Sequence, residues 1–154
     1  MRLDNKNEYI SFVNDNKERV PIYFHPEWLN AVCGNLWAVL IYKNKANKIE
    51  AIMPLPYIIK FGKIIFTMPK QTQFLGIWFD INQDVLNHKR YSKEQEIIDS
   101  FIPRIPRFLL FKLRFSPKFI NSQAFQWHGF KQTNQYSYAL ENIKDHDQLF
   151  KSFK

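Results

Sequence analysis

Apolar side chains recur with helical spacing in the first 34 residues of this chain and form strand-like runs after them. The segment 1–20 is mostly polar but carries apolar residues at positions i, i+3 and i+4, namely Tyr9, Phe12 and Val13. This spacing predicts a short amphipathic helix. A second helix is predicted over 24–34, where Pro26 suits the first helical position and Gly34 suits the residue after the last turn.

Three strands are predicted next. The run "LWAVLIY" (36–42) is continuously apolar, which is typical of a strand buried on both faces. After the turn-forming "NKANK", the run 51–59 carries Pro54 and Pro56. Two missing N–H groups on one side predict an edge or bulged strand. With "IIFTM" (64–68) after a further turn, the pattern predicts an antiparallel meander.

The second half of the chain alternates helices and strands. A helix is predicted over 92–102 with Ser92 near its cap, and prolines follow it. Alternating apolar residues predict a strand over 107–115. A short helix closed by Gly129 and a final strand over 131–143 follow. The whole chain is therefore predicted to be one α+β (mixed α/β) domain with a largely antiparallel central sheet flanked by helices.

The end of the chain permits two interpretations. "DHDQLFKSFK" (145–154) begins like a capped helix with Asp145, yet the sequence stops after about two turns. Either the segment is a frayed terminal helix docked on the sheet, or the chain is cut within a longer protein. We expect the second: residues 1–154 form a single N-terminal domain, truncated from a two-domain protein whose C-terminal half is absent.

Composition and charge narrow the classes of protein to which this chain can belong. The 154 residues include 15 Phe and only 4 Gly, which argues against disorder, and the net charge of +8 suggests an acidic partner. The basic residues are scattered, however, and "FKLRFSPKF" (111–119) fits a half-buried strand, so nucleic-acid binding is not the first interpretation. With no signal peptide and no run long enough to span a bilayer, we expect a cytoplasmic protein.

Metal and disulfide chemistry are not predicted. Cys33 is the single cysteine, and the four histidines show no ligand-like pairing. We expect Cys33 to pack as a small apolar residue on its helix.

Three segments carry a family resemblance: "YFHPEWLNAVCG" (23–34), "MPKQTQFLGIWF" (68–79), and "WHGFKQTNQYSYAL" (127–140) leading into "DQLFKSFK". With them, the sequence resembles the N-terminal half of Fem-like proteins of the GNAT acyltransferase superfamily. The resemblance implies a GNAT-like half that is normally paired with a second such half. It implies transfer of an acyl or aminoacyl group to an amine, with this half on the acceptor side.

The resemblance also implies the cofactors and partners. The donor, acyl-CoA or an aminoacyl-tRNA, is expected to bind the missing C-terminal half. The Gly-rich loop that binds pyrophosphate in such enzymes has no counterpart here, because all four glycines are isolated. No cofactor is therefore expected on this half, and the acceptor would be a small amine or a peptide-like molecule.

The candidate groove residues fall in two segments. Around Gly76, polar side chains precede an aromatic cluster, and they could line the mouth of a mostly apolar pocket with Trp78 as its wall. The alternative is a turn that enters a core strand, with the glutamines in water. The second segment could present tyrosine hydroxyls as proton donors, although such spacing also fits ordinary strand packing. The candidates are Gln71, Thr72, Gln73, Trp78, Gln135, Tyr136 and Tyr138.

Two other classes of function remain open from the sequence. The first is a non-enzymatic module that binds an anionic ligand or single-stranded nucleic acid through basic and aromatic side chains. The second is a half-domain that self-associates to cover apolar surface.

Overall fold

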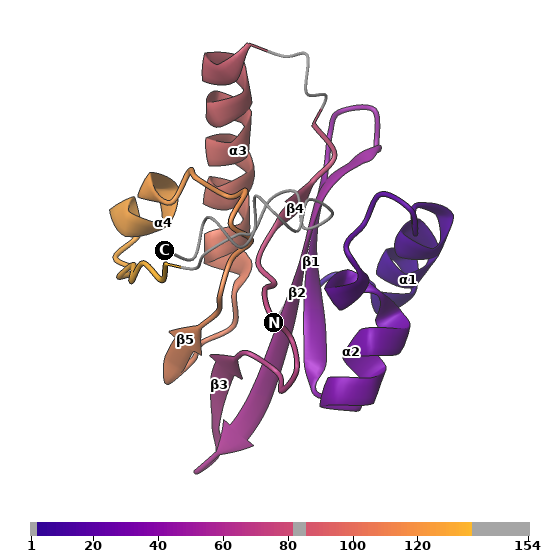
Figure 1. Cartoon of the computed structure of the whole chain (residues 1–154), viewed down its shortest axis with the longest axis vertical. Coiled ribbons are helices and arrows are strands. Elements are labelled where there is room, and N and C mark those ends of the chain that lie inside the picture. The colour runs from indigo at the N-terminus through magenta and orange to yellow at the C-terminus, as the bar shows by residue number, and fades with distance from the viewer. Residues whose placement is uncertain (1–2, 82–85, 137–154) are drawn as a thin grey trace, which may run out of the picture.

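The computed structural model describes residues 3–81 and 86–136, and they form an α+β fold. A mixed sheet runs through the middle of the molecule, with two helices on one side and two on the other (Figure 1). The predicted fold class is thereby confirmed. The remaining residues lie outside this description.

The two N-terminal helices form where their capping residues predict. Helix α1 (Lys6–Asp15) begins after Asn5, whose side chain accepts a hydrogen bond from the backbone N–H of Asn7, and it buries Tyr9 and Val13. A 3-10 turn (Ile22–Phe24) leads to α2 (Pro26–Cys33), which has Pro26 in its first turn and ends at Gly34 with φ of +58°. Both predicted helices are confirmed.

The sheet is largely antiparallel. Strands β1 (Trp37–Lys43), β2 (Ile49–Lys60) and β3 (Lys63–Thr67) form the predicted meander. The short β4 (Trp78–Phe79) pairs antiparallel with β2, and β5 (Leu110–Lys112) runs parallel to β3. The strand order is β1-β2-β3-β5, with β4 attached beside β2.

Of the two alternatives predicted for the proline-bearing strand, the edge position is wrong; β2 does carry a one-residue register shift against β1, at Glu50, before the prolines. Strand β2 is central, with β1 on one side and both β3 and β4 on the other. The N–H of Tyr57 bonds to Leu36 in the direction of β1, so alternation points the nitrogens of Pro54 and Pro56 away from β1. On that far side, β4 pairs with β2 only at Ala51 and Ile52, and β3 pairs only from Tyr57 onward. The prolines therefore occupy a stretch where no ladder hydrogen bond is lost.

The elements of the second half differ from the predicted bounds. Helix α3 (Asn87–Phe101) begins five residues before Ser92, which lies inside it and donates its hydroxyl to the carbonyl of His88. A 3-10 turn (Ile102–Arg104) ends the helical stretch. The strand predicted over 107–115 shortens to β5, and α4 (Gln123–Trp127) forms before Gly129 as predicted.

Two apolar cores lie on opposite faces of the sheet. The first core joins α1 and α2 to β1 through Tyr9, Leu29, Trp37 and Val39. The second core joins α3 and α4 to the sheet through Leu40, Met53, Ile98 and Phe125. Neighbouring residues of β1 thus enter different cores, which explains its continuous apolar sequence.

A charged pair covers the outer edge of β1. Asp4 accepts a hydrogen bond from the backbone N–H of Ile41 at 2.5 Å, and Arg104 donates to the carbonyl of Ile41 at 3.1 Å. Asp4 and Arg104 also pair with each other. The exposed polar groups of an edge strand invite pairing with another chain, so this clamp protects the edge.

Only part of the secondary structure predicted for the C-terminal segment falls within the described residues. Residues 131–136 form neither helix nor strand, so that part of the predicted final strand is wrong. The rest of that strand, including Tyr138, and the helix predicted over 145–154 lie outside the described residues.

Candidate functional site

The segment that precedes the aromatic cluster is a turn. Lys70 and Gln71 form its corner, and Gln71 has φ of +59°. The side chains of Gln71 and Gln73 are exposed to solvent. This is the arrangement that the alternative interpretation predicted, a turn with its glutamines in water.

Thr72 is buried, in contrast to its two glutamine neighbours. Its side chain is only 7% exposed, and its hydroxyl oxygen accepts a hydrogen bond at 3.0 Å from the indole Nε1 of Trp28. The hydroxyl also donates to the carbonyl of Lys70 at 3.3 Å. Thr72 therefore ties the turn to α2, and its polar group is already satisfied.

Gly76 allows the chain to bend and to pass closely under an aromatic ring. It has φ of +97°, and a Cβ added there would lie 2.5 Å from the ring of Phe115. Beside it, Leu75 bridges to Phe115 in parallel, and its N–H bonds to Arg114. Glycine is the residue that tolerates both constraints.

Trp78 lies in β4 and packs toward α1. Its ring centroid is 5.8 Å from that of Phe12, and the Arg19 guanidinium also lies 5.8 Å from the ring. The indole is half-buried in the first core, so most of its faces are already in contact with protein.

The structure does not bring the two candidate segments together. Gln135 is exposed and Tyr136 is 93% exposed, and both follow α4 on the opposite side of the sheet from α1 (Figure 1). Trp78 belongs to the core on the α1 side. Tyr138 lies outside the described residues.

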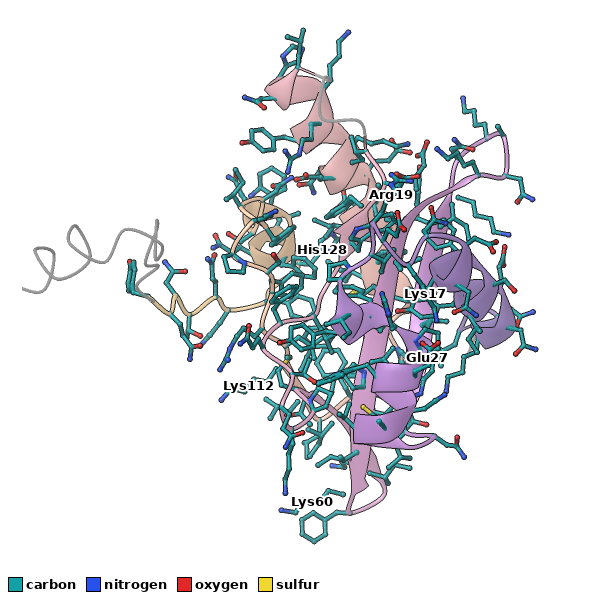
Figure 2. All side chains as sticks on the ribbon, turned by 45° about the vertical axis from the view of Figure 1, so that its right-hand side comes forward. Lys17, Arg19, Glu27, Lys60, Lys112 and His128 are labelled. Carbon is teal, nitrogen blue, oxygen red and sulfur yellow. The ribbon has the colours of Figure 1, made fainter. Side chains whose placement is uncertain are left out.

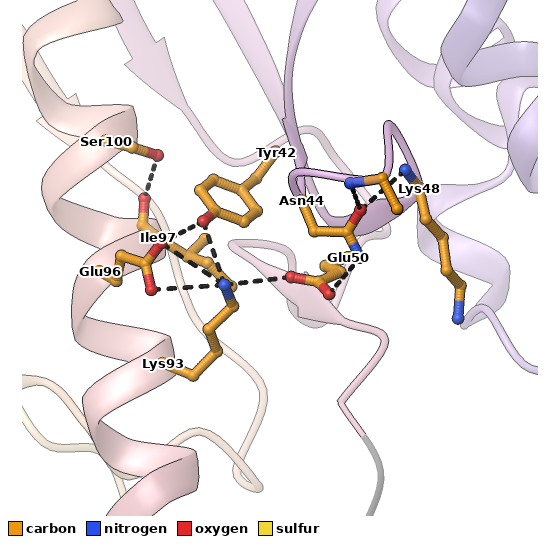
Figure 3. Close-up of polar contacts among 9 residues, drawn as sticks. Tyr42, Asn44, Lys48, Glu50, Lys93, Glu96, Ile97 and Ser100 are labelled. Atoms are coloured by element: carbon orange, nitrogen blue, oxygen red, sulfur yellow. Dashed lines mark hydrogen bonds and ion pairs between the residues drawn. The ribbon is translucent and has the colours of Figure 1, made fainter.

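A polar cluster that the sequence analysis missed joins the β1–β2 hairpin to α3 (Figure 3). Lys93 on α3 donates a hydrogen bond to the hydroxyl of Tyr42 at 3.1 Å, and its ammonium lies 4.8 Å from the ring. The same ammonium lies 3.3 Å from a carboxylate oxygen of Glu96 and 3.2 Å from Oε2 of Glu50. The Tyr42 hydroxyl donates a hydrogen bond to Glu96, and the side-chain amide of Asn44 donates one to Glu50 at 2.7 Å.

The contact between Lys93 and Glu50 is an ion pair without hydrogen-bond geometry. Oε2 of Glu50 is buried and accepts no hydrogen bond, although it lies within ion-pair distance of the ammonium. Desolvation alone would lower the pKa of Lys93, but its contacts with Tyr42, Glu50 and Glu96 outweigh this and raise that pKa. Lys93 is therefore held as a cation.

The other two members of the cluster are shifted in opposite directions. Burial and the hydrogen bond to Glu96 raise the pKa of Tyr42, so its hydroxyl keeps its proton. The hydrogen bond from Tyr42 lowers the pKa of Glu96, which therefore stays ionised. Chemically, the cluster is a set of acceptors arranged around a primary ammonium, with one protonated hydroxyl beside it.

One contact of this cluster has a recognisable pattern in the sequence. Lys93 and Glu96 stand at i and i+3 on a helix, a spacing at which side chains meet. The partners Tyr42 and Glu50 come from a distant hairpin, and only the packing of α3 on the sheet brings them within reach.

Two of the histidines, His25 and His128, and the cysteine take structural positions. His25 precedes α2 and places its Nε2 2.9 Å from the carbonyl of Val20, and His128 follows α4 with its Nε2 2.8 Å from Asp99. Cys33 packs against the first core, as predicted, and burial raises the pKa of its thiol. Among residues 3–81 and 86–136, no three side chains of the metal-binding types converge.

None of the helices in the described ranges combines the length and apolar character needed to cross a bilayer.

Comparisons with known proteins give no functional name. No family model matches the chain, and no curated protein matches it. A mutant of the BH1408 protein from Bacillus halodurans aligns over 89% of this chain and 88% of its own, with 14% identity and a TM-score of 0.37. A tetramutant of the same protein aligns over 88% of each chain, with 14% identity and a TM-score of 0.33. Both TM-scores are below 0.5, so neither alignment indicates a shared fold or a function.

Proposed function

We propose that this chain is the acceptor-side half of an N-acyltransferase of the Fem-like, GNAT class, which transfers an acyl or aminoacyl group to an amine. The observation that supports it is the sheet architecture. An antiparallel meander is followed by α3 and by a strand parallel to β3, with helices on both faces. This α+β architecture is compatible with the mixed α/β half that the sequence resemblance implies, and it supports the proposal to that extent.

The polar cluster provides a place for an amine acceptor. Tyr42, Glu50 and Glu96 already surround a primary ammonium, that of Lys93, with a hydroxyl, two carboxylates and an aromatic face. The carboxylate side chain of Glu96 is 58% exposed and is the member that a second amine reaches from solvent. In this proposal, the exposed amides of Gln71 and Gln73 are available to a peptide-like acceptor, whereas Thr72 and Trp78 support the fold.

In this proposal, the acyl donor binds a second GNAT-like half, because the described chain offers no Gly-rich phosphate loop. The four glycines, Gly34, Gly62, Gly76 and Gly129, stand singly in the sequence, each at a separate turn or bend with positive φ. Acyl-CoA or an aminoacyl-tRNA would therefore approach the acceptor from another domain or subunit.

Calorimetric titration tests the proposal. We expect saturable binding of an amine acceptor, with spermidine and a lysine-containing peptide as probes, and no binding of CoA or acetyl-CoA. Glu96→Gln should weaken amine binding by about two- to fivefold, the range of an exposed ion pair. The matched control is Glu27→Gln, which removes a similarly exposed carboxylate on α2, one that pairs with Lys17. Binding of CoA to this chain would overturn the division of roles, and binding of neither probe would overturn the proposal.

A further inference from the structure

The net positive charge of this protein comes from two segments of the sequence that contain no acidic residue. Neither 51–79 nor 100–140 contains an aspartate or a glutamate. Together they carry nine basic residues: Lys60, Lys63, Lys70, Arg104, Arg107, Lys112, Arg114, Lys118 and Lys131. The rest of the chain holds the other 13 basic residues and all 14 acidic ones, so it is nearly neutral.

The fold brings these two acid-free segments side by side. Strand β3 from the first segment pairs in parallel with β5 from the second, and β3 also pairs with the end of β2. We call this part of the sheet, residues 57–67 and 107–112, the basic end. Its β2–β3 hairpin extends past α2 in Figure 1, and Figure 2 shows Lys60 at the tip of that hairpin and Lys112 beside the sheet, both away from the Lys17–Glu27 pair. Within the described residues, its four basic side chains, Lys60, Lys63, Arg107 and Lys112, form no ion pair.

Large apolar side chains are exposed at the same place. The exposed fractions are 45% for Ile58, 62% for Ile59, 87% for Phe61, 54% for Leu109 and 49% for Leu110. Consecutive strand residues point to opposite faces, so Ile58 and Ile59 expose apolar surface on both faces of the sheet.

The tip of the β2–β3 hairpin holds its most exposed apolar side chain in a strained conformation. Phe61 has φ of +53°, a left-handed value that bulky residues rarely adopt. The β1–β2 turn provides an internal comparison, because its left-handed residue is Asn47, with φ of +61°, a residue type that tolerates this region. Local stability therefore favours Asn over Phe at position 61, which points to a use for the ring outside the fold.

We propose that the basic end docks on an anionic lipid bilayer, with Phe61 inserted at the interface and the neighbouring lysines on the headgroups. A bilayer interface surrounds an inserted tip, so it covers apolar side chains on both faces of the sheet at once. A flat macromolecular partner covers one face only. Most of the exposed apolar side chains are aliphatic, which suits hydrocarbon better than the base stacking of a nucleic acid. This proposal is independent of the acyl-transfer chemistry.

Vesicle co-sedimentation tests it with the full chain. We expect binding to phosphatidylcholine vesicles that contain phosphatidylglycerol, weak or no binding to pure phosphatidylcholine, and loss of binding as salt is raised. Phe61→Asn should lower vesicle affinity by about tenfold or more, since a buried aromatic side chain contributes strongly. The same variant should keep or raise the melting temperature, because Asn suits the left-handed backbone.

Matched variants separate docking from general effects. Lys60→Gln and Lys63→Gln should each lower vesicle affinity by roughly fivefold. Lys45→Gln, at the opposite hairpin, and Ile22→Asn, an exposed apolar residue outside the basic end, should leave it unchanged. If Phe61→Asn proves unstable, Ile59→Ser serves in its place.

Three results would overturn the proposal. One is equal binding of the Phe61 or Ile59 variant and the parent chain to anionic vesicles. Another is tight binding of a single-stranded oligonucleotide without vesicle binding, which would assign the basic end to nucleic acid. The third is a dimer in light scattering that the Phe61 variant abolishes, without vesicle binding, which would assign it to a second copy of this chain.

Discussion

At the scale of single residues, the environment of a side chain decides its role more than its type does. Thr72 stands between two exposed glutamines, yet it is buried and accepts the indole hydrogen bond of Trp28. Gly76 lies among aromatic residues in the sequence, but the ring that leaves no room for a side chain there belongs to Phe115, from a distant segment. Both residues are needed for the turn and for the strand that follows it.

A pair of substitutions at Thr72 tests this role. Thr72→Val should lower the free energy of unfolding by about 1–2 kcal/mol, because the Trp28 N–H loses its acceptor. Thr72→Ser keeps the hydroxyl and should cost about half of that or less. Urea unfolding monitored by tryptophan fluorescence gives the comparison. If the valine variant is as stable as the parent chain but loses amine binding, Thr72 faces a groove after all.

At the scale of elements, α3 is fixed to the β1–β2 hairpin by charge as well as by packing. Its apolar face enters the second core through Ile97, Ile98 and Phe101. At one side of that face, Lys93 and Glu96 reach Tyr42 and Glu50 on the hairpin. The cluster therefore sets the position of the helix along the strands, which apolar contacts specify less sharply.

Removing the Tyr42 hydroxyl should loosen this attachment in a pH-dependent way. The pKa of Glu96 is lowered mainly by the hydrogen bond from Tyr42, so it should rise toward its ordinary value in Tyr42→Phe. A carboxyl group with a lowered folded-state pKa stabilises the protein above its unfolded-state pKa, and this contribution disappears as pH falls through the folded-state value.

The stability difference between Tyr42→Phe and the parent chain should therefore be largest near neutral pH, at about 0.5 kcal/mol or less for so exposed a pair. It should shrink in acid. Carboxyl NMR titration and urea unfolding at several pH values measure both effects. Tyr91→Phe, on the same helix, is the control. An unchanged Glu96 pKa in Tyr42→Phe would contradict the assigned cause.

At the scale of the whole molecule, the net positive charge lies in the two acid-free segments, four of whose basic side chains form the basic end, while the rest of the chain is nearly neutral. Lys60 and Lys63 are directly opposite each other across the β2–β3 hairpin, and like charges in that position repel. The clamp of Asp4 and Arg104 covers the β1 edge of the sheet. At the other end of the strand order lies β5, which belongs to the basic end. Lys60 and Lys63 therefore repel each other at this end of the sheet, and the stability of the rest of the fold offsets this repulsion.

Reversing one of these charges should raise stability. We expect Lys63→Glu to increase the free energy of unfolding by about 0.2–1 kcal/mol at low ionic strength, and the gain should shrink in concentrated salt. Lys45→Glu should instead lower stability, because Lys45 helps to keep Glu96 ionised. Thermal unfolding at two salt concentrations decides between these outcomes. If the stability gained in Lys63→Glu does not depend on the salt concentration, charge repulsion is not its cause.

The sequence by itself determined the type and order of most elements. Helical spacing, Pro26 and Gly34 defined the N-terminal helices, and continuous apolar runs defined the meander, because these signals act between residues close in the chain. The bounds of α3 and β5 were predicted less well. Ser92 resembles a cap, but its hydroxyl bonds inside the helix, and β5 is limited to the length that pairs with β3.

Only the tertiary structure decided which segments meet. It placed the proline-bearing β2 in the centre of the sheet, because the prolines fall between its pairings with β4 and β3. It also assembled Tyr42, Glu50 and Lys93 into one cluster, and it joined two acid-free segments into one basic end. Such encounters depend on strand register and on the packing of two cores against one sheet. These are properties of residues far apart in the chain, and local patterns do not encode them.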